Sequence, residues 1–172
     1  MEGKAQARVG GYFDCVIKDK KGNVRDEFRV HNLVVNEGLD YLLNAGLYAG
    51  STAQITAWYV GILGNRTPAA TDTMSDIGSD DVVGYDEATR PQYTPNGATS
   101  SQSVSNSSSP ATFTCSSDST SFYGLFVCSS SSKTDTSSTL LAAAAFPSTK
   151  VLDEGEELLA TYNFGAADAD GS

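Results

Sequence analysis

The chain carries a single histidine, His31, so side-chain catalysis that needs an imidazole base has only one residue to work with. Serine–histidine and cysteine–histidine mechanisms both need a histidine that takes a proton from the nucleophile. His31 stands beside Asn32, just ahead of an apolar triplet, and the sequence contains no G-x-S-x-G turn. We therefore expect His31 to be a hydrogen-bonded structural residue. No catalytic residue is assigned, and the chain is predicted not to be an enzyme.

Acidic residues in pairs are the second group that could do chemistry, as ligands of a metal ion. Calcium binds carboxylate and carbonyl oxygens, but no pair has the spacing of an EF-hand, and one histidine with scattered cysteines makes no zinc site. No motif selects two carboxylates as a glycosidase pair, and there is no G-x-G-x-x-G or P-loop. We expect solvated acidic loops, with no metal and no cofactor. The pairs are Asp72/Asp76, Asp80–Asp81, Asp153–Glu154 and Asp168/Asp170.

The three cysteines, Cys15, Cys115 and Cys128, are an odd number without a metal or catalytic signature. An odd count in a reducing compartment is typical of buried free thiols. Cys115 and Cys128 fall in segments that could be neighbouring strands, but that proximity alone does not establish a disulfide.

Composition and charge limit the partners of the chain. Its 172 residues suit one domain over 1–172, and its net charge of −10 argues against nucleic acid, which needs clustered Lys and Arg. The charge is uneven, since residues 1–30 hold seven basic and five acidic residues while the remainder holds four and sixteen. No run approaches the roughly 20 apolar residues of a membrane span, and no signal peptide is evident. We expect synthesis in the cytoplasm and no membrane partner.

Two elements near the start of the chain have clear patterns. Two β-type runs around a Lys-rich, Gly-containing turn predict an N-terminal hairpin over about 7–31. Beyond it, Leu39, Leu42 and Leu43 recur at helical spacing, which predicts a short amphipathic helix against a sheet. Asn36 is its expected N-cap and Gly46 its expected stop.

The rest of the chain is predicted to be mostly strand. Ile55–Leu63 is the most apolar run and suits a central strand with Trp58 in the core. Residues 64–100 are expected to form a long excursion with one or two short strands, which contacts a neighbouring subunit. Further strands are expected, with Ser-rich turns and an exposed acidic tail from 165 to 172, at Ala111–Cys115, Ser121–Cys128, Leu140–Phe146 and Leu158–Phe164. About eight to ten strands at these spacings predict an all-β sandwich.

Several segments, in their order, resemble a pattern in small structural proteins of tailed bacteriophages. An N-L-V-x-N-x-G-L-x-x-L start is followed by an aromatic strand ending in hxhG, where h is hydrophobic, by a Y-x-E-x-x-R segment and by a closing strand of the form v-x-x-G-d-x-L-x-v-x-Y. Together they cover most of residues 30–164. The matching segments are Asn32–Leu43, Ile55–Leu63, Tyr85–Pro91, Ser107–Phe113, Phe122–Val127 and Val151–Tyr162.

The resemblance implies a jelly-roll-like β-sandwich in the virion and supplies no catalytic residues. Within that class we favour a capsid cement or decoration protein, because the chain is one short domain without a fibre repeat. It would act as a homotrimer on the capsid surface that bridges subunits of the major capsid protein. The alternative is a tail or head-fibre component that binds a host receptor or glycan through loops with Tyr85, Tyr93 and Tyr123.

Overall fold

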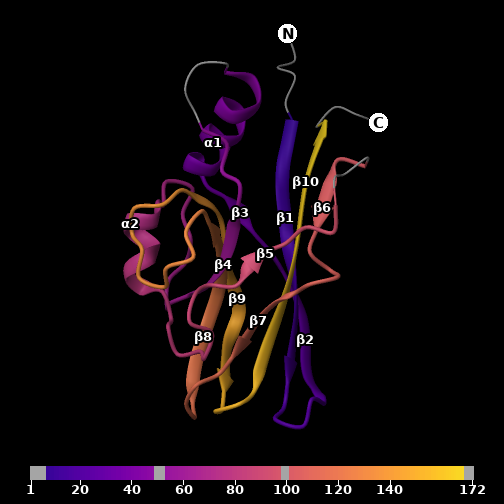
Figure 1. The fold of residues 1–172 in the computed structure, drawn as a ribbon, viewed down its shortest axis with the longest axis vertical. Helices are drawn as coiled ribbons and strands as arrows, with labels where there is room; N and C mark the ends of the chain where they lie inside the picture. Colours follow the sequence, from indigo (N-terminus) through magenta and orange to yellow (C-terminus); the bar gives the residue numbers. More distant parts are fainter. Residues whose placement is uncertain (1–6, 49–52, 98–100, 169–172) are drawn as a thin grey trace.

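The protein is an all-β sandwich of two antiparallel sheets with two short helices (Figure 1). The structure is a computed structural model that describes residues 7–48, 53–97 and 101–168. The first sheet has the order β2–β1–β10–β6, with β7 also paired to β10. Its strands are β1 (Ala7–Lys18), β2 (Val24–His31), β6 (Ser103–Ser105), β7 (Ala111–Thr114) and β10 (Glu157–Asp168).

The second sheet has the order β3–β9–β8–β4–β5 and carries the helices at its margins. Its strands are β3 (Leu33–Val34), β4 (Trp58–Leu63), β5 (Gln92–Tyr93), β8 (Thr120–Cys128) and β9 (Leu140–Leu152). The helices are α1 (Asn36–Leu47) and α2 (Met74–Ile77), and a 3-10 turn, Gly78–Asp80, follows α2. The ten strands in the described part of the chain agree with the predicted all-β sandwich.

Strands β1 and β10 form the long axis of the first sheet. They pair over twelve positions, from Ala7 opposite Asp168 to Lys18 opposite Glu157. The predicted hairpin is confirmed, since β2 pairs with β1 and Asp19 closes the turn by accepting the N–H groups of Lys21 and Asn23. The segment predicted as an exposed tail from 165 is exposed at Ala166 and Ala167, but residues 165–168 continue β10 instead of leaving the sheet. Residues 169–172 lie outside the described part.

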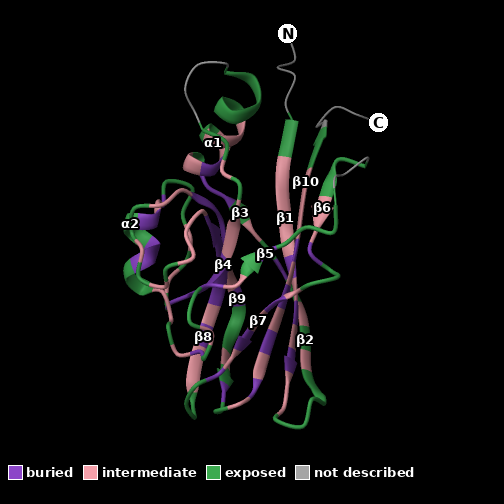
Figure 2. Cartoon of the chain, in the orientation of Figure 1, coloured by how far each residue is buried: buried purple, intermediate pink, exposed green. Residues whose placement is uncertain are grey.

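Alternation along these strands places the core between the sheets (Figure 2). Phe13, Cys15 and Ile17 of β1 are buried, and the Phe13 ring stacks on Tyr162 of β10 at 4.6 Å between centroids. On the facing sheet the run Ala142–Ala144 is buried in β9, which confirms the strand assignment of this alanine-rich segment. The small side chains of β9 let helix α1 pack close to this strand.

Helix α1 is confirmed, but its ends differ from the prediction. Asn36 is its first residue and makes no capping bond, and Gly46 lies inside the helix instead of ending it. The helix approaches β9 at Gly38, where a side chain would strike the Leu141 carbonyl, and Glu37 accepts the Leu140 N–H at 2.9 Å. Contacts of its N-terminal part therefore hold the helix against β9.

In its described residues, 64–97, the predicted excursion over 64–100 contains one short strand, β5, and also a helical turn that was not predicted. Thr73 and Asp76 form a capping box that starts α2. The predicted central strand is shorter than expected, because β4 begins only at Trp58. Trp58 is partly buried and packs edge-on against Tyr41 at 5.3 Å, beside the core.

Candidate functional site

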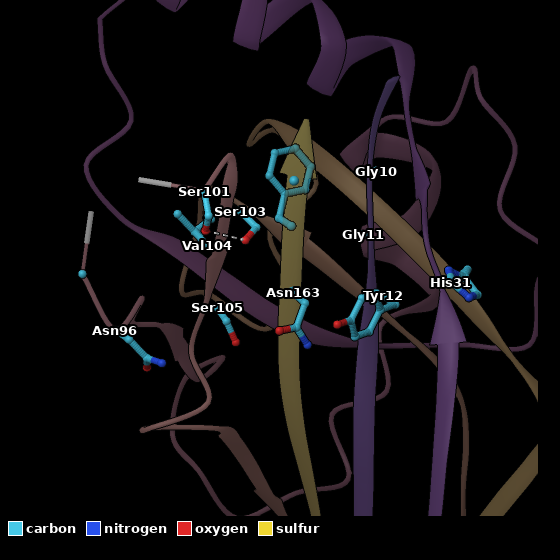
Figure 3. Close-up of a pocket in the computed structure, with 13 residues that line it drawn as sticks. Gly10, Gly11, Tyr12, His31, Asn96, Ser101, Ser103, Val104, Ser105 and Asn163 are labelled. Carbon is cyan, nitrogen blue, oxygen red and sulfur yellow. Dashed lines mark hydrogen bonds between the residues drawn. The ribbon is translucent and has the colours of Figure 1, made fainter. Parts of the chain in front are cut away.

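A row of four polar side chains crosses the outer face of the first sheet. His31 of β2 pairs with Tyr12 of β1, Tyr12 pairs with Asn163 of β10, and Asn163 pairs with Ser105 of β6. Each of the first three has a buried residue next to it in its strand, Val30, Phe13 and Tyr162, so this row faces away from the core. In Figure 3 the Tyr12 ring lies between His31 and Asn163, and Ser105 stands beyond Asn163.

The next outward-facing row is built from glycine, which leaves a hollow above the backbone. Gly10 pairs with Gly165, and Gly165 pairs with Ser103. A side chain at Gly10 would meet nothing within 4 Å, whereas one at Gly11 would strike the Asn163 carbonyl. The hollow has a volume of about 620 Å³ and is bounded by both rows (Figure 3). We call it the glycine groove.

Tyr12 is held in place from two sides. The Arg29 guanidinium lies over its ring at 3.9 Å from the centroid, and the His31 ring meets it edge-on at 5.9 Å. Arg29 is itself fixed by Asp14, whose two carboxylate oxygens accept its Nε–H at 2.6 Å and a terminal N–H at 2.9 Å. Arg29 and Asp14 lie on the side of Tyr12 away from the Gly10 row, and Tyr12 lines the groove.

The far wall of the groove comes from the segment around Asn96. Its backbone N–H donates to the Ser105 carbonyl at 2.8 Å, and its side-chain amide donates to the Ser107 hydroxyl at 2.8 Å. The same amide accepts the Ser108 N–H at 2.9 Å, so this wall is tied to β6. The Ser105 hydroxyl is buried and has no hydrogen-bond partner among the described residues.

The groove offers binding chemistry and no nucleophile paired with a base. Its lining carries no Lys, Arg, Asp or Glu, and its polar groups are hydroxyls, amides and one imidazole. His31 is exposed and contacts Tyr12 without a ring hydrogen bond within the described part of the chain, so the prediction of a hydrogen-bonded structural histidine is wrong. What the arrangement can do is hold an uncharged polar molecule.

The acidic pairs are not all solvated loops. Asp72 is buried and pairs with Arg66 at 2.9 Å, and the Asp81 side chain is 1% exposed and pairs with Arg90 at 3.1 Å. Asp153, as expected, is exposed. Across 7–48, 53–97 and 101–168, no group of three acidic, His or Cys residues could hold a metal ion. Asp170 and the Asp168 side chain lie outside what the structure describes.

Arg90 is the largest fully buried charged group and organises the loops at the edge of the second sheet. Its guanidinium donates to Asp81 and also to Cys128 Sγ at 3.2 Å, and it lies 5.1 Å from the centroid of the Phe126 ring. Three further bonds run to loop carbonyls of Ser130, Lys133 and Asp135. Burial raises the pKa of Asp81 to about 6, against the lowering effect of Arg90. This centre is structural, since its cation is enclosed by protein groups.

The cysteine prediction is confirmed, because all three thiols are free and buried. Burial raises the pKa of Cys15 to about 12, and it also raises the pKa of Cys128. Thiols in this state are poor nucleophiles.

A second surface of interest is the exposed C-terminal part of α1, at one end of the molecule (Figure 2). Leu43 is 57% exposed, Leu47 84% and Tyr48 65%. The prediction that Leu43 faces the sheet is therefore wrong, while Leu39 and Leu42 pack against the core as predicted. Three large apolar side chains on one helix end form what we call the α1 apolar face, a feature typical of a contact surface.

Sequence reasoning missed the glycine groove and misplaced the tyrosines expected to bind sugars. Tyr85 and Tyr93 are buried at 3% and 8% exposure, and Tyr123 is partly buried. The available signal was alternation, since Gly10 and Tyr12 share one face of a strand whose other face is apolar. The pairing that brings Asn163 and Ser105 beside them could not be obtained from that pattern.

No helix in the described part of the chain is long and apolar enough to cross a membrane. No protein-family model, curated protein or solved structure matches the chain.

Proposed function

We propose that the protein is a bacteriophage virion protein that stabilises the capsid, as a homotrimer that bridges subunits of the major capsid protein on the capsid surface. The observation that carries the proposal is the α1 apolar face, formed by Leu43, Leu47 and Tyr48. Apolar side chains exposed together on a helix gain free energy when a neighbouring protein covers them. The order of the phage-like sequence segments supports a capsid subunit as that neighbour.

The shape of the sandwich supports a bridging role. The β1–β10 ladder is twelve residues long, which corresponds to about 40 Å of paired strand. Figure 1 places α1 at one end of this ladder and the charged β1–β2 turn at the other. A paired β-ladder keeps two chemically different ends at a fixed separation, as a connector between subunits requires. Many symmetric copies would add their individual contacts by avidity.

The proposal predicts that virions without this protein release their DNA at a lower temperature than complete virions. The reason is that packaged DNA pushes outward on the shell, and the lost bridges would no longer oppose it. DNA release is followed by dye fluorescence during a heating ramp. Adding back the purified protein is the control and should restore the original release temperature. An unchanged release temperature in stripped virions would argue against capsid stabilisation.

The fibre alternative loses two of the three tyrosines that motivated it, because Tyr85 and Tyr93 are buried in the core while Tyr123 is partly buried. The glycine groove offers a further surface for a receptor- or glycan-binding role, in addition to the hollow of about 420 Å³ that Tyr123 lines.

A further inference from the structure

We propose that the glycine groove is a binding site for a neutral saccharide, formed by the row His31–Tyr12–Asn163–Ser105 over the Gly10–Gly165 floor. This inference does not depend on the capsid role, because the groove lies on the first sheet and the α1 apolar face belongs to a helix beside the second.

The size and floor of the groove suit a sugar ring. Its volume of about 620 Å³ lies within the roughly 300–1,000 Å³ of small-molecule sites. Gly10 and Gly165 stand at adjacent positions of β1 and β10 and lack side chains, so a ligand can approach the backbone closely there. Nothing within 4 Å fills the position of a Gly10 side chain. The hollow is therefore open where a ring would lie.

The walls offer one aromatic surface and several hydrogen-bonding groups, which is the combination that a hydroxyl-rich ring needs. Tyr12, which Arg29 covers on one ring face, lines the groove and supplies an aromatic side chain for contact with the C–H groups of a ring. The Asn163 amide donates one N–H to Asp14 at 3.4 Å, and its second N–H and its carbonyl oxygen can bond two neighbouring hydroxyls. Ser105 also lines the groove, and its buried hydroxyl has no hydrogen-bond partner among the described residues.

Charge selects a neutral ligand over an anionic one. The lining holds no Lys, Arg, Asp or Glu, so the groove itself supplies no ion-pair partner. Phosphates, sulfated sugars and nucleic acid would therefore find no lysine or arginine in the lining to pair with. A purely apolar ligand would leave the amide and hydroxyl groups of the groove without partners.

The test is a titration of the ¹⁵N-labelled protein with glucose, galactose, mannose and N-acetylglucosamine, followed by amide chemical shifts. At least one sugar should shift the amides of Gly10 and Gly165 and saturate with a Kd of about 1 mM. Gly10→Leu should fill the groove and weaken binding at least tenfold, and the fold should accept it because a Cβ at this position has no atom within 4 Å. Val16→Leu, on the same face of β1 but outside the groove, should bind like the unchanged protein.

A second variant tests the site without placing a larger side chain in the groove. Asn163→Ala removes the amide and should also weaken binding at least tenfold, while thermal unfolding reports that the fold persists. The proposal is overturned if none of the four sugars shifts the groove amides, if Gly10→Leu binds as before, or if glucose 6-phosphate binds more tightly than glucose. None of these results bears on the DNA-release experiment, so the two proposals can fail separately.

Discussion

Replacing Arg90 with methionine should destabilise the protein by about 3–5 kcal/mol, the loss measured when one partner of a buried ion pair is removed. The side chains of Arg90 and Asp81 are 0% and 1% exposed, so the variant leaves a buried carboxylate without its counter-charge. The same change withdraws the donors that tie the carbonyls of Ser130, Lys133 and Asp135 together. The measurement is urea unfolding followed by Trp58 fluorescence and by circular dichroism.

Arg29→Met is the matched control, because Arg29 also pairs with a carboxylate but on the surface. Its side chain is 53% exposed and that of Asp14 is 41% exposed, so water screens the pair. The Arg29 variant should therefore unfold at a urea concentration close to that of the unchanged protein. Equal losses for the two variants would contradict the structural role assigned to the Arg90 centre.

Replacing Leu43 and Leu47 together with serine should weaken binding to capsids by about 10²–10⁴-fold. Burying a leucine is worth about 1.5–3 kcal/mol, so two leucines covered by a capsid subunit contribute about 3–6 kcal/mol, and each 1.4 kcal/mol is about a factor of ten. Both side chains are exposed in the isolated chain, so the variant should fold normally. Binding is measured by co-sedimentation of labelled protein with capsids that lack it.

Val151→Ser is the control for that experiment, since Val151 is also exposed, at 49%, but belongs to β9 and not to the α1 apolar face. It should bind capsids like the unchanged protein, and so should Gly10→Leu. Capsid binding that survives the loss of both leucines would show that another surface makes the contact.

Local patterns in the sequence were sufficient for most elements of the sandwich. Alternation of buried and outward residues predicted β10, whose Leu158, Ala160 and Tyr162 line the core. The turn chemistry of Asp19 to Asn23 predicted the hairpin, and leucine spacing predicted α1. Each of these signals acts over a few residues, which is why it can be read along a single chain.

Features that depend on distant pairing could not be predicted in this way. Gly165 was assigned to a tail, because only its pairing with Gly10 makes it part of a strand. Arg90 gave no sign of burial, since its partners Asp81 and Cys128 come from separate segments. The glycine groove could not be predicted for the same reason, because four strands from both ends and the middle of the chain build it.

The position of the protein in an intact particle tests the proposed function most directly. A cryo-electron microscopy map of the virion should show copies of the sandwich, arranged as trimers at junctions between capsid subunits over the whole shell. In that map Leu43, Leu47 and Tyr48 should be covered by the major capsid protein. Density confined to the tail, or an α1 apolar face open to solvent on the shell, would contradict the proposal.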